Sequence, residues 1–152
     1  MQNRLQRLAK QWSQGKVSLK QIVGLSEEEM YALSSLGYML FLQGKSQEAR
    51  VIFEGLVAVD PRNPYYYRAL GTIYWRLKDN QKALKQFTYA IRVAPRDISS
   101  YVNRAEVHVA TRNFKAAAAD LRHALENGRH HELPLLNKAR AMLRMIPRSA
   151  RS

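Results

Sequence analysis

The sequence has no cysteine, few acidic residues and no long apolar run. Without cysteine the chain cannot form disulfides, use a thiol as a nucleophile or bind a metal through thiolates, which is compatible with a reducing cytoplasm. Its longest apolar stretches fall far short of the roughly 20 residues that a membrane-spanning helix needs. The N-terminus lacks an apolar block followed by a small-residue cleavage site, so we expect no cleaved secretory signal. These absences favour a cytoplasmic protein.

The shortage of acidic residues leaves a formal net charge of +13, which is unevenly distributed. Residues 1–25 carry five basic and no acidic side chains, and residues 129–152 carry six basic side chains and one acidic. Residues 26–128 are nearly balanced, with fourteen basic and eleven acidic side chains. Basic flanks are most often solvated, although they can contact phosphates, an anionic membrane or an acidic protein. We therefore do not expect nucleic acid or a membrane as the main partner.

The sequence does have a repeat of 34 residues. Five columns of matching residue size recur at this offset without an insertion: Gly37, Gly71 and Ala105; Ala49, Ala83 and Ala117; Phe53, Phe87 and Leu121; Leu56, Ala90 and Ala124; Pro61 and Pro95. A period of 34 with small residues at these offsets is typical of tetratricopeptide (TPR) repeats.

Each column has a physical reason. Glycine in the middle of a helix costs about 1 kcal/mol relative to alanine, so Gly37 and Gly71 indicate that a neighbouring helix packs too closely for a larger side chain. The alanine column supplies the matching small surface, and the phenylalanine column lies one turn later on the same face. Pro61 and Pro95 end the second helix of their repeats because proline cannot donate an amide hydrogen.

The pattern predicts an all-α fold, a right-handed α-solenoid of three TPR helix pairs with an N-terminal helical segment and a C-terminal capping helix. We expect the three repeats, at about 30–63, 64–97 and 98–130, to fill residues 26–128. Their first helices are predicted near 27–43, 64–77 and 98–111, and their second helices near 46–59, 80–93 and 114–127. Residues 1–25 form the basic N-terminal segment, 131–146 the capping helix, and 147–152 a frayed tail.

The first helix of each pair lines the concave face of such a stack. Aromatic rings gather at these positions, and exposed rings cost free energy in water unless a partner covers them. The alternative is that some of the rings pack between repeats. The predicted peptide-binding residues are Tyr31, Ser34, Tyr38, Phe41, Tyr65, Arg68, Thr72, Trp75, Val102, Asn103 and Glu106.

One known type of TPR groove binds the acidic C-terminal tails of heat-shock chaperones through lysines, asparagines and an arginine. The corresponding positions here are Ser34, Tyr38, Ala69, Ser99 and Asn103, of which only Asn103 keeps an amide. Recognition of a terminal carboxylate by this route is therefore not expected.

The sequence does not indicate an enzyme, a metal site or a cofactor. It has no phosphate-binding glycine loop and no metal-binding His-Glu-x-x-His pattern. His130, His131 and Glu132 are adjacent, and because neighbouring side chains diverge we interpret them as part of a loop before the capping helix. His108 takes the place of an aromatic residue in a packing column, so we expect it to be buried or half-buried.

The organisation of the whole chain resembles the class II chaperones of type III secretion translocators. The resemblance covers about residues 15–145 and is most specific in the run LKQIVGLSEEEMYALSSLGYMLFLQGKSQEARVIFEGLVAVDP, residues 19–61. It implies an ATP-independent cytoplasmic chaperone that holds an extended segment of a hydrophobic translocator subunit in the concave groove before export. It also implies a homodimer through the N-terminal helices, with Leu5, Leu8, Trp12 and Ile22 as the contact residues. The alternative is a general TPR scaffold whose basic flanks dock an acidic protein, a nucleic acid or a membrane.

Overall fold

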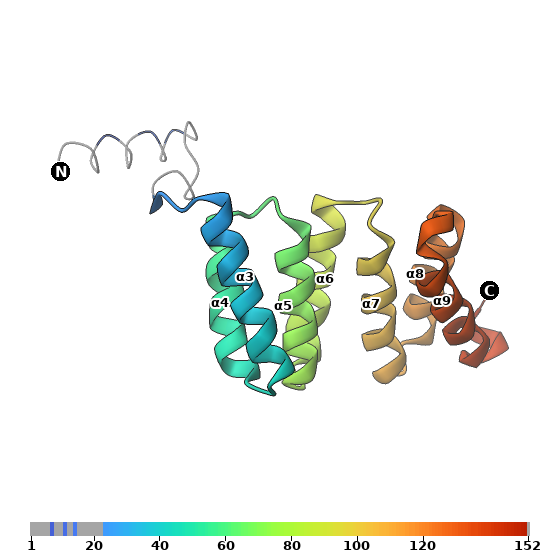
Figure 1. Cartoon of the computed structure of the whole chain (residues 1–152). Helices are drawn as coiled ribbons and strands as arrows, with labels where there is room; N and C mark the ends of the chain where they lie inside the picture. Colours follow the sequence, from blue (N-terminus) through green and yellow to red (C-terminus); the bar gives the residue numbers. More distant parts are fainter. Residues whose placement is uncertain (1–6, 8–10, 12–13, 15–22, 152) are drawn as a thin grey trace.

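The computed structural model describes residues 7, 11, 14 and 23–151. Three antiparallel helix pairs and a last helix follow one another in a row, with α3, α5 and α7 on one side and α4, α6 and α8 on the other (Figure 1). The expected all-α repeat fold is confirmed, and the six repeat helices end within one residue of the predicted positions. The helices are α3 (Glu27–Leu42), α4 (Ser46–Val59), α5 (Pro64–Arg76), α6 (Asn80–Val93), α7 (Ile98–Ala110), α8 (Phe114–Asn127) and α9 (Leu133–Met145).

Side chains at the helix ends fix where the helices begin and how the pairs turn. Ser26 and Glu29 form a capping box, in which the Glu29 amide donates to the Ser26 hydroxyl at 3.1 Å and the Ser26 amide to the Glu29 carboxylate at 2.7 Å. Gly44, Lys78 and Arg112 make the turns within the pairs, at the same place in each repeat, with φ angles of 80°, 65° and 59°. Only glycine adopts such angles without steric cost, so the turn is strained in the second and third repeats.

The repeated small residues lie where two helices touch. Ala49, Ala83 and Ala117 have no exposed surface. A Cβ atom built on Gly71 would lie 2.7 Å from the ring of Phe87, which is closer than real Cβ contacts come. The glycine is therefore required by the phenylalanine beneath it, as the sequence pattern predicts.

The buried apolar residues form two clusters rather than one. The first lies in α3–α6 and reaches Val107 of α7, whereas the second joins α7, α8 and α9. Arg104 of α7 links α8 and α6, because its guanidinium donates to the two Asp120 carboxylate oxygens at 2.8 and 2.7 Å and to the Thr88 hydroxyl at 3.1 Å. The α9 helix continues the solenoid, since its fully buried Ala139 lies 34 residues after Ala105.

The expectation of a frayed C-terminal tail is wrong through residue 151. The chain turns back after α9 through a short 3₁₀ helix, Arg148–Ala150, and Ile146 is buried in the second cluster. Arg151 then holds the tail in place, because its Nε donates to the Ile146 carbonyl at 2.6 Å and its own carbonyl accepts from Arg122. These bonds satisfy polar groups at the end of α9.

The predicted N-terminal helical segment falls almost entirely outside the described residues. Its four dimer candidates, Leu5, Leu8, Trp12 and Ile22, all lie there, so the homodimer stays a prediction. Within the part of the chain that the structure describes, every helix is too short or too polar to cross a membrane.

Candidate binding groove

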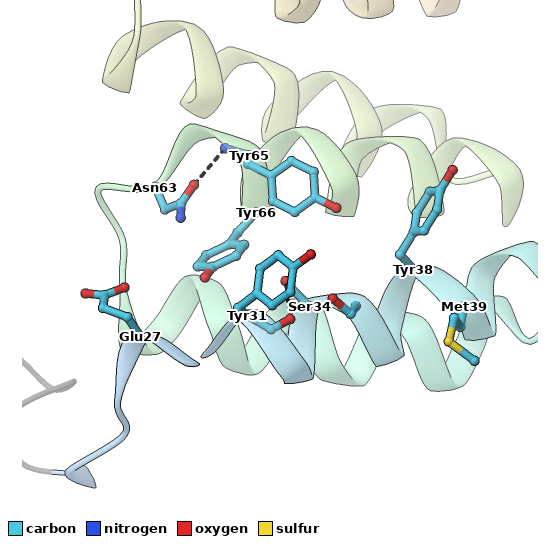
Figure 2. Close-up of a pocket in the computed structure, with 9 residues that line it drawn as sticks. Glu27, Tyr31, Ser34, Tyr38, Met39, Asn63, Tyr65 and Tyr66 are labelled. Atoms are coloured by element: carbon cyan, nitrogen blue, oxygen red, sulfur yellow. Dashed lines mark hydrogen bonds between the residues drawn. The ribbon is translucent and has the colours of Figure 1, made fainter. Parts of the chain in front are cut away.

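Two adjoining pockets open between the first helices of the first two repeats. The larger has a volume of about 640 Å³ and the smaller about 170 Å³. Tyr38 and Tyr65 line both pockets, so together the pockets form one groove. The larger pocket is lined by Glu27, Tyr31, Ser34, Ser35, Tyr38, Met39, Asn63, Tyr65 and Tyr66 (Figure 2), and the smaller by Tyr38, Phe41, Phe53, Tyr65, Arg68, Ala69, Thr72, Ile73 and Asn103.

Tyrosine rings dominate the walls of this groove. Figure 2 shows Tyr31 and Tyr38 projecting from α3 and Tyr65 and Tyr66 from α5. The side chains of Tyr31, Tyr38 and Tyr65 are 74%, 51% and 39% exposed, although a ring of this size is normally covered when it is part of a core. The sequence-based expectation that aromatic residues of the leading helices line an open hollow is met for these three tyrosines.

The ring of Tyr65 is fixed in place by its neighbours. Its centroid lies 6.1 Å from that of Phe53 and 5.9 Å from that of Tyr66, both in edge-to-face arrangements. Such pairs add to the stability that burial alone provides. The second pocket therefore has a rigid wall, with the buried Phe53 and Ile73 also lining it.

Small residues leave room for an occupant between the rings. Ser34 is almost fully buried, and its hydroxyl donates to the Tyr31 carbonyl at 2.8 Å instead of pointing a polar group into the pocket. Thr72 does the same one helix later, donating to the Arg68 carbonyl at 3.1 Å. With their hydroxyl groups bonded to their own helices, both residues leave an apolar surface for a ligand.

Few charges reach the groove. The Arg68 guanidinium is paired with Asp97 and lies 5.9 Å from the centroid of the Tyr65 ring. Burial raises the pKa of Tyr65 above its usual value, and the positive charge of Arg68 offsets part of this effect. The Tyr65 hydroxyl is therefore protonated at neutral pH and can donate a hydrogen bond. Arg68, which we expect to bind the peptide, lines the smaller pocket and is already paired within the chain.

The third repeat contributes much less to the groove than predicted. The prediction for Val102 is wrong, because its side chain is fully buried in the second cluster beside α9. Glu106 lines neither pocket, and its carboxylate pairs with Lys138 of α9 at 2.7 Å. Trp75 is also placed differently, half-buried against the first cluster and outside both pocket linings. Of the predicted third-repeat residues that the structure describes, Asn103 alone lines one of the two pockets of the groove.

Several residues of the groove were missed by sequence reasoning. Ser35 and Met39 lie four and eight positions after Tyr31, on the same stripe of α3, so helical spacing could have found them. Asn63 is the N-cap of α5 and accepts from the Tyr65 amide at 3.0 Å, a position that the following Pro64 signals. Tyr66 packs on the first cluster while its edge lines the pocket, and the repeat pattern alone does not indicate this double role.

The adjacent histidines before α9 lie on a short 3₁₀ helix, His130–Glu132. Glu132 accepts a hydrogen bond from the Arg129 amide at 2.8 Å. The described residues contain no cluster of three or more His, Asp or Glu side chains that could bind a metal ion. His108 is half-buried, as expected from its place in a packing column, and burial lowers its pKa.

Comparison with known proteins agrees with the repeat and with the overall fold. Two family models described as tetratricopeptide repeat match residues 40–98 and 70–144, which together cover more than half of the chain. The chain therefore belongs to the tetratricopeptide repeat family. A 61-residue stretch is 31% identical to the Hsp70-Hsp90 organising protein of Plasmodium falciparum, covering 40% of this chain but only 11% of that protein.

Within this family the structure is similar to the type III secretion translocator chaperones. SycD of Yersinia enterocolitica superposes with a TM-score of 0.82 over 86% of this chain and 98% of its own, at 18% sequence identity. PcrH, in a structure with the chaperone-binding region of PopD, gives a TM-score of 0.77 at 25% identity, over 81% of this chain and 94% of its own. The likeness covers nearly the whole length of both relatives.

Proposed function

We propose that this protein is a chaperone that holds an extended apolar segment of a type III secretion translocator subunit in the groove between α3 and α5. On this account it acts in the cytoplasm before export, when the client's apolar segments would otherwise aggregate. It works by covering the segment rather than by catalysis.

The observation that carries the proposal is the pair of adjoining pockets with open tyrosine rings. Pockets that follow one another along a groove suit an extended chain, whose side chains enter them in turn while its backbone crosses the rim. Tyrosine provides a large apolar face and loses little conformational entropy when it is covered. Covering Tyr31 and Tyr38 with an apolar segment would remove apolar surface of both partners from water.

An extended client also needs partners for its backbone polar groups. The side chain of Asn103 forms no hydrogen bond with the rest of the described chain, so its amide can both donate and accept. The hydroxyl of Tyr65 adds a second donor. An amide and a phenol can form hydrogen bonds with the backbone of any client sequence. This suits a chaperone that recognises its client by the apolar side chains that enter its pockets.

Support from the comparisons is structural. PcrH, which resembles this chain over most of its length, is in complex with the chaperone-binding region of PopD in one solved structure. The groove positions here also lack the lysines and arginine of a carboxylate clamp. An internal apolar segment therefore fits this groove better than an acidic C-terminus.

The test is co-expression with a translocator subunit encoded beside this chain, followed by affinity purification of the complex. Replacing Tyr31→Ala and Tyr38→Ala together should weaken the affinity for the client by at least tenfold, which corresponds to about 1.4 kcal/mol of binding free energy, and should lower the yield of soluble client. Both side chains are more than half exposed, so the variant should retain its helical circular dichroism and melting temperature.

The matched control is Leu36→Ala with Val51→Ala, which removes apolar surface of similar exposure outside both pockets. This control should hold the client as well as the unchanged chain does. A tyrosine variant that binds the client normally, or a control that loses it to the same degree, would contradict the groove as the binding site.

A further inference from the structure

A third pocket lies on a different face of the molecule from the groove. It has a volume of about 360 Å³ and is formed by α6 and α7, which are neighbours in the row of helices (Figure 1). Its α7 side is made by Arg104 and His108, which are four residues apart and therefore share a face of the helix. Asn103 lies about 100° around the same helix from Arg104, which separates this pocket from the groove. The lining residues are Leu84, Lys85, Thr88, Tyr89, Arg92, Arg104 and His108.

The lining of this basic pocket is rich in cations and contains no acidic side chain. Lys85 and Arg92 are exposed at its mouth, and neither forms an ion pair with any described residue. Both instead lie against the ring of Tyr89, with their charged groups 5.9 and 5.8 Å from its centroid. Lys85 lies four residues before Tyr89 and Arg92 three residues after it, so the three side chains share one face of α6.

The rear of the pocket is polar, and Arg104 there already has a partner. Asp120 binds Arg104 through both carboxylate oxygens and is only 8% exposed, so its charge is taken up by that pair. The Nδ1 atom of His108 is buried and has no hydrogen-bond partner among the described residues. Neutral polar groups at the rear and unpaired cations at the mouth favour a ligand that brings negative charge to the opening.

We propose that this basic pocket binds carboxylate side chains of an acidic polypeptide segment. Lys85 and Arg92 would hold one or two carboxylates over Tyr89, and charge-assisted hydrogen bonds of this kind are about twice as strong as neutral ones. A polypeptide fits better than a nucleic acid because the free cations form one pair at a concave site and not a row along a surface. The site is independent of the proposed client groove, and it lies in the part of the chain whose charges are nearly balanced, apart from the basic flanks.

The experiment measures binding of a fluorescein-labelled hexaglutamate peptide by fluorescence anisotropy, at about 0.15 M salt to screen weak surface attraction. The unchanged chain should bind it, whereas a hexaglutamine peptide should not bind. The variant Lys85→Glu/Arg92→Glu should bind hexaglutamate at least tenfold more weakly. Because both residues are exposed, its melting temperature should match that of the unchanged chain.

The matched control is Lys45→Glu/Lys115→Glu, which alters the net charge by the same amount at two exposed positions outside the pocket. It should change the affinity by no more than about twofold. The groove variant Tyr31→Ala/Tyr38→Ala should bind hexaglutamate normally, so that failure of either proposal is separable from failure of the other.

Three results would contradict the proposal that the basic pocket binds carboxylates. One is equal loss of affinity in both charge-reversal variants, which would indicate general attraction to a cationic chain. Another is the absence of hexaglutamate binding by the unchanged chain. The third is tighter binding of a single-stranded oligothymidine that Lys85→Glu/Arg92→Glu abolishes, which would assign the pocket to nucleic acid.

Discussion

The first two repeats and the third repeat share one sequence pattern but use it differently. In the first two, glycine packs on phenylalanine inside an apolar core, and tyrosine rings stand open on the leading helices. In the third, alanine lies in the glycine column, leucine in the phenylalanine column, and Val102 is fully buried in the second cluster. The comparison shows that the repeat sets the backbone, whereas the side chains on the leading helix decide whether it presents exposed rings.

The junction between the two regions also differs from the packing within them. Arg104 and Asp120 occupy the columns that hold Leu36 and Ile52 in the first repeat. In the third repeat an ion pair between α7 and α8 therefore takes the place of two apolar residues, of which Leu36 is 47% exposed. Exchanging residue pairs between repeats tests whether each region is stabilised as described, beginning with the largest expected effect.

The glycine–phenylalanine contact should be the most sensitive point of the first region. Replacing Gly71→Ala places a Cβ atom 2.7 Å from the Phe87 ring, and we expect a loss of about 3 kcal/mol in the free energy of unfolding, the upper end for overpacked cores. Adding Phe87→Leu copies the third repeat and should restore at least about 1 kcal/mol of this loss. Urea denaturation of the two variants and of Phe87→Leu alone measures the coupling.

Gly55→Ala is the control, because it measures how a glycine-to-alanine change alters helix stability where no neighbouring side chain is in the way. Gly55 is exposed in α4 and a Cβ atom there meets no atom within 4 Å, so alanine should stabilise the helix by up to about 1 kcal/mol. If Gly71→Ala were as harmless as Gly55→Ala, the glycine column would not mark close packing and the account of the first region would be wrong.

Breaking the ion pair between Arg104 and Asp120 should lower the free energy of unfolding by a smaller amount. Asp120→Asn leaves the guanidinium of Arg104, which is only 21% exposed, without its counter-charge. Breaking a fully buried pair costs 3–5 kcal/mol, and because Arg104 keeps some contact with water we expect about 2 kcal/mol. Thermal unfolding followed by circular dichroism measures this difference.

The double variant Arg104→Leu/Asp120→Ile transfers the first-repeat pair to the junction. It should unfold within about 1 kcal/mol of the unchanged chain, because apolar residues of suitable volume can replace a buried ion pair. A double variant that is less stable than Asp120→Asn would show that the polar contact is needed to join the two regions, which is the opposite of our expectation.

The fold could be predicted because it depends on local and periodic features. Helix packing and helix ends are signalled directly by glycine, alanine, phenylalanine and proline at fixed offsets. The predicted bounds of the six repeat helices therefore differ from the observed ones by at most one residue. The tail was mispredicted for the opposite reason. Arg122 and Arg151 are 29 residues apart, and a repeat pattern carries no signal for a bond between a repeat helix and a unique terminus.

The groove could be predicted only in part. Helical register places Tyr31, Tyr38 and Tyr65 on the correct face, and their exposure follows from it. Helical register does not indicate which other residues pack on a helix face. The burial of Val102 in the second cluster and the pairing of Glu106 with Lys138 were therefore not predicted. The basic pocket was not predicted for a similar reason. Its lining combines Lys85 and Arg92 of one repeat with Arg104 and His108 of the next.

The most direct test of the central claim is site-specific photo-crosslinking to a co-expressed translocator subunit. The photoreactive residue p-benzoylphenylalanine would replace Tyr38 in one variant and Val51, which lies outside the groove, in another. The account predicts a crosslink from position 38 to an apolar segment of the client and none from position 51. A crosslink from position 51 with none from position 38 would contradict it.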